Sequence, residues 1–313
     1  MKKQTRLIAL AILVLAVALI LFVLFRPAPP EPTHAGRPLR DWLVDFDQAP
    51  STTNYTAACA AIRAMGTNAL PALIRYLRLK DPLFNRQRVS LKAKFKMRFN
   101  PDGEYAWLWH RRAATACGEL GEAGAPAFPA MAEAMQETQA ASDVGSALSR
   151  MLPASASVLT NVLATGAIVA RCEAAHALMT AGWNPAIEEM ARTALLRALQ
   201  DTNAGLRATA ATALQFWNKR LDLVIPALTR VLSDPDVSVR GNAASALGQF
   251  GSAAKSAVPE LIKLLNDTNP YSMPPGTVAD RAMHVLIQID PEAAARAKAE
   301  APSNSPPVGR RIN

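Results

Sequence analysis

The chain has 313 residues, of which half are apolar and only 6% are aromatic. Abundant alanine with few aromatic side chains favours closely packed helices over a β-rich fold. The formal net charge of +9 is confined to two places: about +4 flanks the first apolar run, about +6 lies in residues 80–112, and the rest is close to neutral. A nearly neutral body lacks the broad basic surface of a nucleic-acid-binding domain, which argues against nucleic acid as a partner.

The N-terminal region has the pattern of a membrane anchor. Residues 7–25 are nineteen consecutive apolar residues without a charge. As a helix they rise about 28 Å, close to the hydrocarbon thickness of a bilayer. Basic residues at Lys2, Lys3 and Arg6 predict, by the positive-inside rule, that residues 1–6 are cytoplasmic and the rest of the chain lies outside, in the periplasm of a Gram-negative host.

A cleaved signal peptide is the alternative interpretation of this region. Thr33-His34-Ala35 is the one plausible cleavage site, and cleavage there would release a secreted protein that begins at Gly36. The apolar run is longer than the 7–15 residues usual in signal peptides, which favours an uncleaved anchor. Residues 26–38 contain five prolines and predict an extended, semi-rigid linker.

A repeat of thirty-three residues follows within residues 39–290. Residues at this spacing open apolar segments at Thr193, Pro226 and Pro259, and close them at Asp201, Asp234 and Asp267. Each unit contains an alanine-rich helix and a second helix that starts at proline, where the missing N–H costs nothing. Neither helix buries its apolar stripe alone, so the units are expected to stack. About six pairs are predicted, and residues 291–313 are predicted to be a disordered tail.

These repeats resemble the HEAT family, particularly the HEAT-like repeats of phycobilin lyases. The most specific match is the aspartate and arginine that form a ladder along stacked units, here Asp201, Arg207, Asp234 and Arg240. The resemblance implies an all-α fold, a right-handed α-solenoid with the second helices lining its concave side. The last unit departs from the pattern because Met273 stands where the arginine is expected, which is consistent with a capping repeat.

Basic residues recur at the fourth position after the second-helix starts. These candidate partner-binding residues are Arg75, Arg197, Arg230 and Lys263. On the concave side they would form a groove for an acidic partner segment, since such side chains bind carboxylate or phosphate groups. The alternative is that long basic side chains merely cover a solvated face.

A basic insertion, residues 80–109, separates the first two units. From Arg88 to Phe99 apolar and polar residues alternate, which is the period of a strand, and a helix is expected to follow from near Gly103. The polar face of the strand carries Lys92, Lys94, Lys96 and Arg98. It would suit anionic lipid headgroups, an acidic protein or cell-wall polyanions; the alternative is a passive surface flap.

No catalytic or metal-binding pattern occurs. The four histidines form no HExxH, no GxSxG is present, and the glycines match neither phosphate-binding loop. Cys59, Cys117 and Cys172 are widely spaced and are expected to pack as small apolar side chains, and His176 is expected to be structural. The sequence therefore predicts a protein that is not an enzyme and needs no cofactor, metal or small-molecule substrate.

The predicted function is a membrane-tethered scaffold. It would bind a protein partner through the concave face, the basic insertion or both, and the basic candidate residues favour an acidic partner. The alternatives are a module that binds nucleic acid, anionic lipid or cell wall, and a lyase-like enzyme accessory, which rests on the family resemblance alone.

Overall fold

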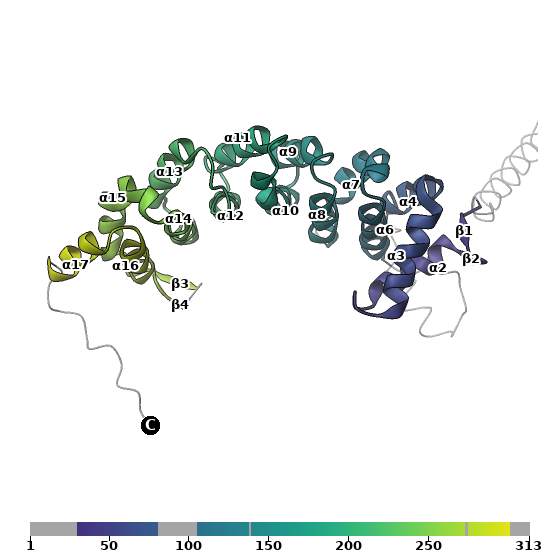
Figure 1. Cartoon of the computed structure of the whole chain (residues 1–313), viewed down its shortest axis with the longest axis horizontal. Coiled ribbons are helices and arrows are strands. Elements are labelled where there is room, and N and C mark those ends of the chain that lie inside the picture. Colours follow the sequence, from purple (N-terminus) through teal and green to yellow (C-terminus); the bar gives the residue numbers. More distant parts are fainter. Residues whose placement is uncertain (1–29, 81–104, 138, 273–274, 301–313) are drawn as a thin grey trace, which may run out of the picture.

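The computed structural model describes residues 30–80, 105–137, 139–272 and 275–300. Their helices form an arch with two layers, and the two ends of the described chain lie at opposite ends of the arch (Figure 1). The predicted helical solenoid is therefore confirmed. The predicted anchor, residues 7–25, and the strand predicted at Arg88–Phe99 lie outside the described residues.

The outer layer, on the convex side of the arch, consists of the helices that begin near a proline or follow a short 3-10 turn (Figure 1). These are α4 (Leu70–Leu77), α7 (Phe128–Ala134), α9 (Ala156–Thr165), α11 (Glu188–Ala198), α13 (Leu221–Arg230) and α15 (Val258–Lys263). Proline stands in the first turn of α4, α7 and α15, where no intrahelical N–H is required. Pro226 departs from this prediction, because α13 begins one turn earlier, at Leu221.

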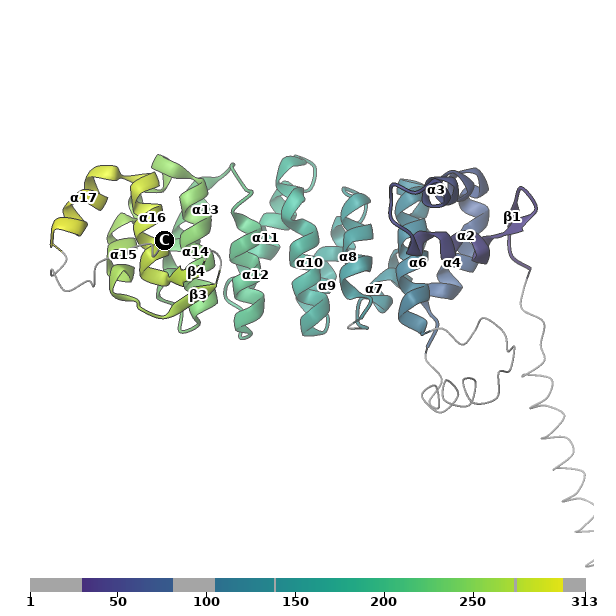
Figure 2. The ribbon, with the colours of Figure 1, turned by 90° about the horizontal axis from the view of Figure 1, so that it is seen from below.

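The inner layer, on the concave side, consists of the alanine-rich helices. These are α6 (Ala106–Leu120), α8 (Ala141–Arg150), α10 (Ile168–Ala177), α12 (Ala204–Leu214), α14 (Val237–Gln249) and α16 (Val278–Ile289). Figure 2, which faces the concave side, shows them next to one another, and each packs against the next. Alanines such as Ala211 and Ala244 are fully buried there, and their small side chains let neighbouring helices approach closely.

The arrangement of the layers corrects one expectation. The family resemblance implied that the second helix of each predicted unit lines the concave side, yet those helices form the convex layer (Figure 1). The outer helices α11, α13 and α15 each pack chiefly against the alanine-rich helix that follows, so the structural unit begins with the outer helix. The repeat length was predicted correctly, but a periodic pattern does not show where a unit starts.

Side-chain caps and short 3-10 segments separate the helices. Asn203 and Asp236 cap α12 and α14, and Thr277 forms a capping box with Asp280 at α16. The 3-10 segments are η2 (Gly66–Ala69), η4 (Gly121–Ala127), η5 (Leu178–Trp183), η6 (Val231–Ser233), η7 (Gly251–Ala257) and η8 (Leu264–Asn266). The helix after the basic insertion, predicted from near Gly103, is α6 and begins at Ala106.

The N-terminal end of the arch corrects the predicted linker. Within residues 26–38, strands β1 (Thr33–His34) and β2 (Arg37–Pro38) form an antiparallel hairpin instead of an extended spacer. The hairpin leads into α2 (Leu39–Val44), η1 (Asp45–Asp47) and α3 (Thr53–Met65). The turn Ala35-Gly36 has positive φ at both residues, 50° and 74°, which is the geometry of a two-residue hairpin turn.

The C-terminal end corrects the predicted tail. Pro291–Glu300 form α17, which packs on α16 and buries Ala293, Ala294 and Ala297. The sequence of α17 is rich in charge, but three alanines on one face are sufficient to cover the end of the core. Residues 301–313 lie outside the described part of the chain.

One helical stretch within the described residues, Thr53–Leu77, is long and apolar enough to cross a membrane. Half of that stretch is buried, and Gly66, at φ 55°, interrupts it between α3 and α4. Ile62 and Leu73 are fully buried in the repeat core. Its apolar character is therefore accounted for by packing within the solenoid.

Candidate interaction surface

The predicted basic groove does not form. Arg197, Arg230 and Lys263 lie on α11, α13 and α15, which belong to the convex layer (Figure 1). Arg75 on α4 makes an ion pair of 2.7 Å with Glu31, and only a third of its side chain is exposed. These four residues therefore do not share a concave surface, and one of them has a structural partner.

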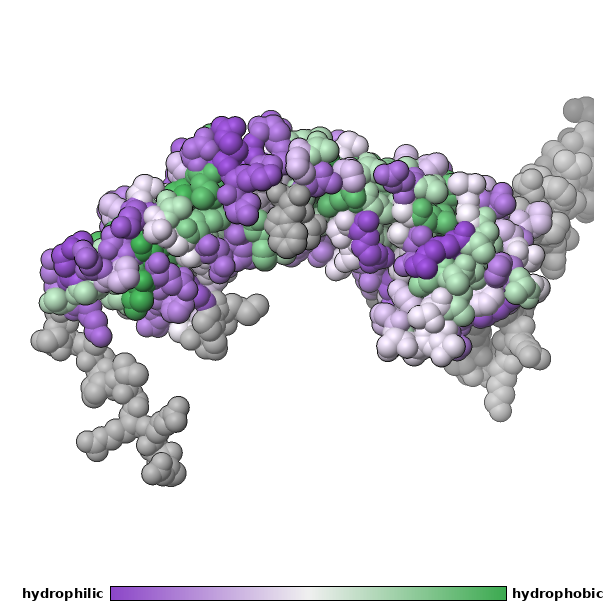
Figure 3. All heavy atoms as spheres, viewed as in Figure 1, coloured by the Kyte–Doolittle hydropathy of each residue, from purple (hydrophilic) through white to green (hydrophobic). Residues whose placement is uncertain are grey.

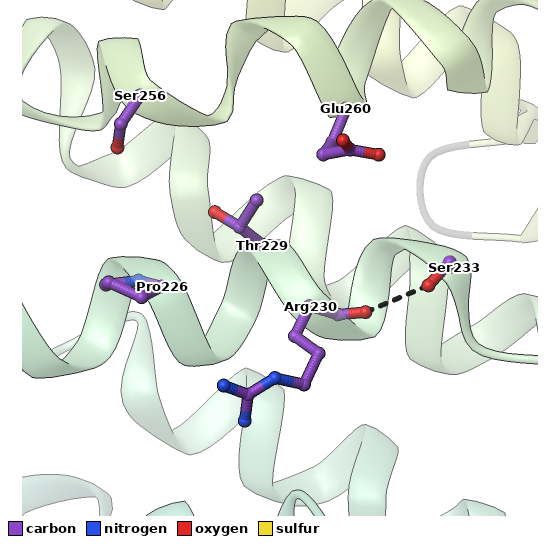
Figure 4. A pocket seen from close by; sticks show the side chains of 6 residues that line it. All are labelled: Pro226, Thr229, Arg230, Ser233, Ser256 and Glu260. Atoms are coloured by element: carbon purple, nitrogen blue, oxygen red, sulfur yellow. Dashed lines mark hydrogen bonds between the residues drawn. The ribbon is translucent and has the colours of Figure 1, made fainter.

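A shallow cavity of about 420 Å³ lies between two outer helices, beside Arg230 (Figure 4). Thr229 and Arg230 of α13 line it together with Glu260 of α15. Glu260 also accepts a hydrogen bond of 2.7 Å from Lys263. Because acidic and basic groups are mixed here, this groove does not provide the uniformly basic surface that was predicted for an acidic partner.

Hydrophilic residues gather on the convex surface around α11 and α13, as the side view in Figure 3 shows.

The candidate residues of the basic insertion, Lys92, Lys94, Lys96 and Arg98, lie outside the described residues. In the sequence the insertion follows α4, and its last residues, 106–109, belong to α6. Its role stays a prediction.

Ion pairs join successive units along one edge of the solenoid. Arg207 on α12 donates from Nε and Nη2 to the Asp234 carboxylate, at 2.7 and 2.8 Å. Arg240 on α14 donates from Nε to Asp267 at 2.7 Å. Each aspartate lies 27 residues after its arginine, between the outer and inner helices of the next unit. At most 13% of each of these four side chains is exposed, so the rungs are largely shielded from solvent.

Each ladder arginine also binds the loop of its own unit. Arg207 Nη1 donates to the carbonyl oxygens of Asp201 and Thr202, at 2.9 and 3.1 Å. Arg240 Nη1 does the same to Asp234 and Pro235, at 2.8 and 3.0 Å. The arginine therefore joins the backbone of its own unit to the carboxylate of the next, and the carboxylate partner is not the same-unit aspartate.

The hydrogen bonds in the ladder lower the pKa values of its aspartates. Burial raises the pKa of Asp234, but hydrogen bonds from the Arg207 guanidinium and the Asp236 N–H outweigh it, so the pKa of Asp234 is lowered overall. Asp267 follows the same pattern, with Arg240 and Asn269 as donors, and its pKa is also lowered. Both carboxylates are therefore held in the charged form that the ladder requires.

Two further arginines of this arrangement were not predicted from the sequence. Arg171 on α10 pairs with Asp201, and Arg281 on α16 stands at the matching place. Arg171, Arg207, Arg240 and Arg281 are each the fourth residue of their inner helix. The fourth position of each inner helix would have identified Arg171 and Arg281. The sequence prediction instead looked for an arginine six residues after each aspartate, and that spacing did not find them.

A small hairpin explains why Met273 stands where an arginine was expected. Strands β3 (Pro270–Ser272) and β4 (Pro275–Thr277) are inserted between Asp267 and α16, which displaces the arginine to Arg281. Tyr271 of the hairpin is buried and donates a hydrogen bond of 2.6 Å to Asn242 on α14. A Cβ at Gly241 would lie 2.2 Å from the Tyr271 ring, so the ring occupies space that only glycine leaves open.

The concave face is lined by small polar side chains of the inner helices. Half-buried Thr209 and Thr212 on α12 and Ser245 on α14 each donate to the carbonyl of the residue four positions earlier, at 2.8–3.1 Å. Their oxygens keep lone pairs available to accept hydrogen bonds. On α10, Cys172 is half-buried and His176, predicted to be structural, is exposed beside Glu173 at 3.9 Å. This surface can therefore admit a polypeptide close to the helices and offer it hydrogen-bond acceptors.

The described residues contain no group of three or more His, Cys, Asp or Glu that could hold a metal ion. Cys59 and Cys117 are buried, and burial raises the pKa of the Cys117 thiol to about 12.

A family model described as HEAT repeats matches residues 191–273 and 225–297. These matches span α11 to α17, the region in which the arginine–aspartate ladder is most regular. The chain contains HEAT repeats. No curated protein sequence matches it.

Several solved structures are similar to these HEAT repeats. An engineered protein is 18% identical, with 73% of this chain and 97% of that chain covered and a TM-score of 0.42. Kap121p is 15% identical, over 83% of this chain and 32% of its own, with a TM-score of 0.48. The complex of CpcE and CpcF of phycocyanin lyase from Nostoc sp. PCC7120 is 18% identical, over 87% and 96%, with a TM-score of 0.33.

Proposed function

We propose that this protein is a membrane-tethered, non-enzymatic scaffold whose HEAT repeats bind a protein partner along the concave face. The observation that supports this most is the inner layer itself. Six inner helices line the inside of the arch, and three of them, α8, α12 and α14, carry small polar residues that are exposed or half-buried: Ser146, Thr209, Thr212 and Ser245. Solenoids use such extended concave surfaces for binding.

The proposed binding face differs from the one that the basic residues indicated. Arg197 and Arg230 are exposed, but they lie on the convex layer. The proposed contact surface therefore centres on Ser146, Thr209 and Ser245, from α8, α12 and α14. The basic insertion, which follows α4 in the sequence, is proposed as a second contact.

The tether is proposed from the sequence. The charge-free run at residues 7–25 has the length of a transmembrane helix, and the basic residues before it favour an N-terminus in the cytoplasm. The repeats would then lie outside the cytoplasm, in the periplasm of a Gram-negative cell.

Site-specific cross-linking of the full-length protein tests the proposed face. A photo-reactive residue at Ser146 or Thr209 should yield a discrete protein adduct in intact cells, whereas one at Thr229 on the convex α13 should not. Thr209→Arg and Ser245→Arg, which place bulk and charge on the inner face, should suppress the Ser146 adduct. Arg230→Glu is the matched convex control. Adducts that form only from the convex position would overturn the proposal.

A further inference from the structure

We propose that Glu31 anchors an N-terminal cap that belongs to the repeat domain, so that the mature protein retains the residues before Gly36. The tether is then only the five residues 26–30. This inference extends the proposed membrane attachment, and it concerns which of the two N-terminal processing routes the folded protein requires.

The Glu31 carboxylate makes three contacts with the domain. It accepts a hydrogen bond of 2.7 Å from Arg75 Nη2, another from the Tyr76 hydroxyl, and one of 3.1 Å from the Arg40 backbone N–H. Only 13% of the Glu31 side chain is exposed. Arg75 and Tyr76 are 44 and 45 residues away along the chain, so these contacts close the N-terminal segment onto α4.

The contacts extend from Glu31 into the first unit. The Tyr76 ring stacks on Trp109 of α6, with ring centroids 4.7 Å apart and planes at 16°. Tyr76 is 6% exposed and Trp109 is 3% exposed. The hydroxyl of Tyr76 is therefore a buried polar group whose hydrogen bond goes to the N-terminal segment. Burial and the Glu31 carboxylate both raise the pKa of Tyr76, which keeps the hydroxyl protonated as a donor.

The hairpin after Glu31 adds further contacts. The backbone N–H of Leu39 donates to the carbonyl oxygen of Pro32 at 2.9 Å. The Trp42 indole N–H donates to the backbone carbonyl oxygen of His34 at 3.4 Å. Arg37 lies over the Trp42 ring, 4.3 Å from its centroid, and pairs with Asp45 at 2.6 Å. Residues on both sides of the Ala35–Gly36 bond thus pack on the same helix, α2.

Cleavage after Ala35 would remove half of this cap. It would delete β1 and Glu31, and leave Arg75 and the buried Tyr76 hydroxyl without their shared carboxylate. Both donors would lose a charge-assisted hydrogen bond, which contributes more to stability than a neutral one. A chain that begins at Gly36 would therefore fold with an incomplete N-terminal cap. Solenoids depend on such capping elements.

The cap also sets the length of the tether. Five residues span at most about 17 Å when fully extended. With residues 7–25 in a bilayer, the α2–α4 end of the arch would lie within that distance of the membrane surface. The tethered end is the one at which the row of inner helices begins, with α6.

Analysis of the mature chain tests the inference. The full-length gene product with a C-terminal tag is purified from detergent-solubilised cells, and its intact mass and N-terminal sequence are measured. We expect a mature chain that includes Glu31. A folded mature chain that begins at Gly36 would overturn the inference. A chain cut between residues 26 and 30 and recovered without detergent would contradict the tether but support the cap, so the two proposals fail separately.

Variants of the full-length protein test the role of Glu31 as an anchor. Glu31→Ala should lower the melting temperature by several degrees and make the Ala35–Gly36 turn more sensitive to added protease. Glu122→Ala is the matched control, because Glu122 is an exposed glutamate in η4. Tyr76→Phe should reproduce part of the Glu31→Ala loss, and adding it to Glu31→Ala should cost little more. Equal stability of Glu31→Ala and wild type would overturn the anchoring role.

Discussion

The N-terminal and C-terminal parts of the arch are stabilised by different kinds of contact. From α10 to α16, successive units are joined by the same arginine–aspartate contact, repeated at nearly constant spacing. From Glu31 to α6, each contact differs from the others: Arg112 pairs with Asp47 across 65 residues, and Arg75 pairs with Glu31 across 44. Aromatic rings fill the N-terminal end, where Trp109 lies between Tyr76 and Arg112.

This difference follows from position in the stack. An interior unit has a similar neighbour on each side, so one contact pattern can be repeated for every junction. The first unit has no preceding unit, and its exposed end is covered by a segment of unrelated sequence. The N-terminal end is therefore stabilised by contacts that occur only there, whereas the interior junctions repeat one contact.

The largest effect is expected for the buried arginine Arg112, which pairs with Asp47 at the N-terminal end. The Arg112 side chain is 2% exposed, its Nε lies 3.0 Å from Asp47, and its guanidinium lies 4.7 Å from the Trp109 centroid. Arg112→Met should lower the free energy of unfolding by about 2–4 kcal/mol, measured by urea denaturation. Arg78→Met is the control, because the Arg78–Glu133 pair is half-exposed and should contribute less than about 1 kcal/mol. Equal losses would show that the N-terminal end does not depend on the buried pair.

A smaller effect is expected for one rung of the ladder. Arg240→Ala should cost about 1–3 kcal/mol, because Asp267 and two loop carbonyls lose a charged donor. Arg230→Ala, on the exposed face of α13, should change stability by less than about 0.5 kcal/mol. A double-mutant cycle with Asp267→Ala measures the coupling directly. Additive losses in that cycle would show that the pair contributes no interaction energy.

The C-terminal hairpin should respond to a single methyl group. Gly241→Ala should cost about 1–2 kcal/mol, because the added Cβ meets the Tyr271 ring and the hairpin must move. Combining it with Tyr271→Ala should remove most of the Gly241→Ala cost. Ser245→Ala, one turn later on α14, is the control. Thermal unfolding followed by circular dichroism measures all four variants, and an undiminished Gly241→Ala cost in the double variant would rule out the ring contact as its cause.

The smallest expected difference is in the dependence of stability on pH. The pKa values of Asp201, Asp234 and Asp267 are lowered in the folded state from the ordinary value of 3.8. Each carboxylate therefore adds stability that is fully present above the unfolded-state pKa and is lost as pH falls through the folded-state pKa. Wild type should lose stability below about pH 4, and Arg240→Ala should lose less over the same range, because one rung is already broken. Urea denaturation at pH 7, 4 and 3 measures the free energy of unfolding of both proteins. If the ladder does not titrate, both will lose the same free energy between pH 7 and pH 3.

Much of the repeat region was predictable because its pattern is local and recurrent. The spacing of Asp201, Asp234 and Asp267 indicated the repeat, and the alanine-rich segments indicated helices that pack closely. The ladder residues Arg207 and Arg240 were identified from the same register. The carboxylate partner of each arginine was not, because that contact joins different units.

The candidate surface was harder to predict. Arg197, Arg230 and Lys263 share a helical register, which shows that they lie on equivalent faces, but a register does not tell the convex layer from the concave one. That assignment depends on which helix of each pair approaches its neighbours more closely. Alanine content indicates close approach, and here it marks the concave layer.

The sequence by itself determined the repeat length, the helical content and the composition of both layers, because periodicity and side-chain size act over a few turns of helix. Only the tertiary structure decided where a unit begins, which layer faces inward, and which ends are capped. Glu31 illustrates the reason: within a proline-rich segment nothing distinguishes it from a linker residue. Its role arises when α4 places Arg75 and Tyr76 beside it, across more than forty residues of chain.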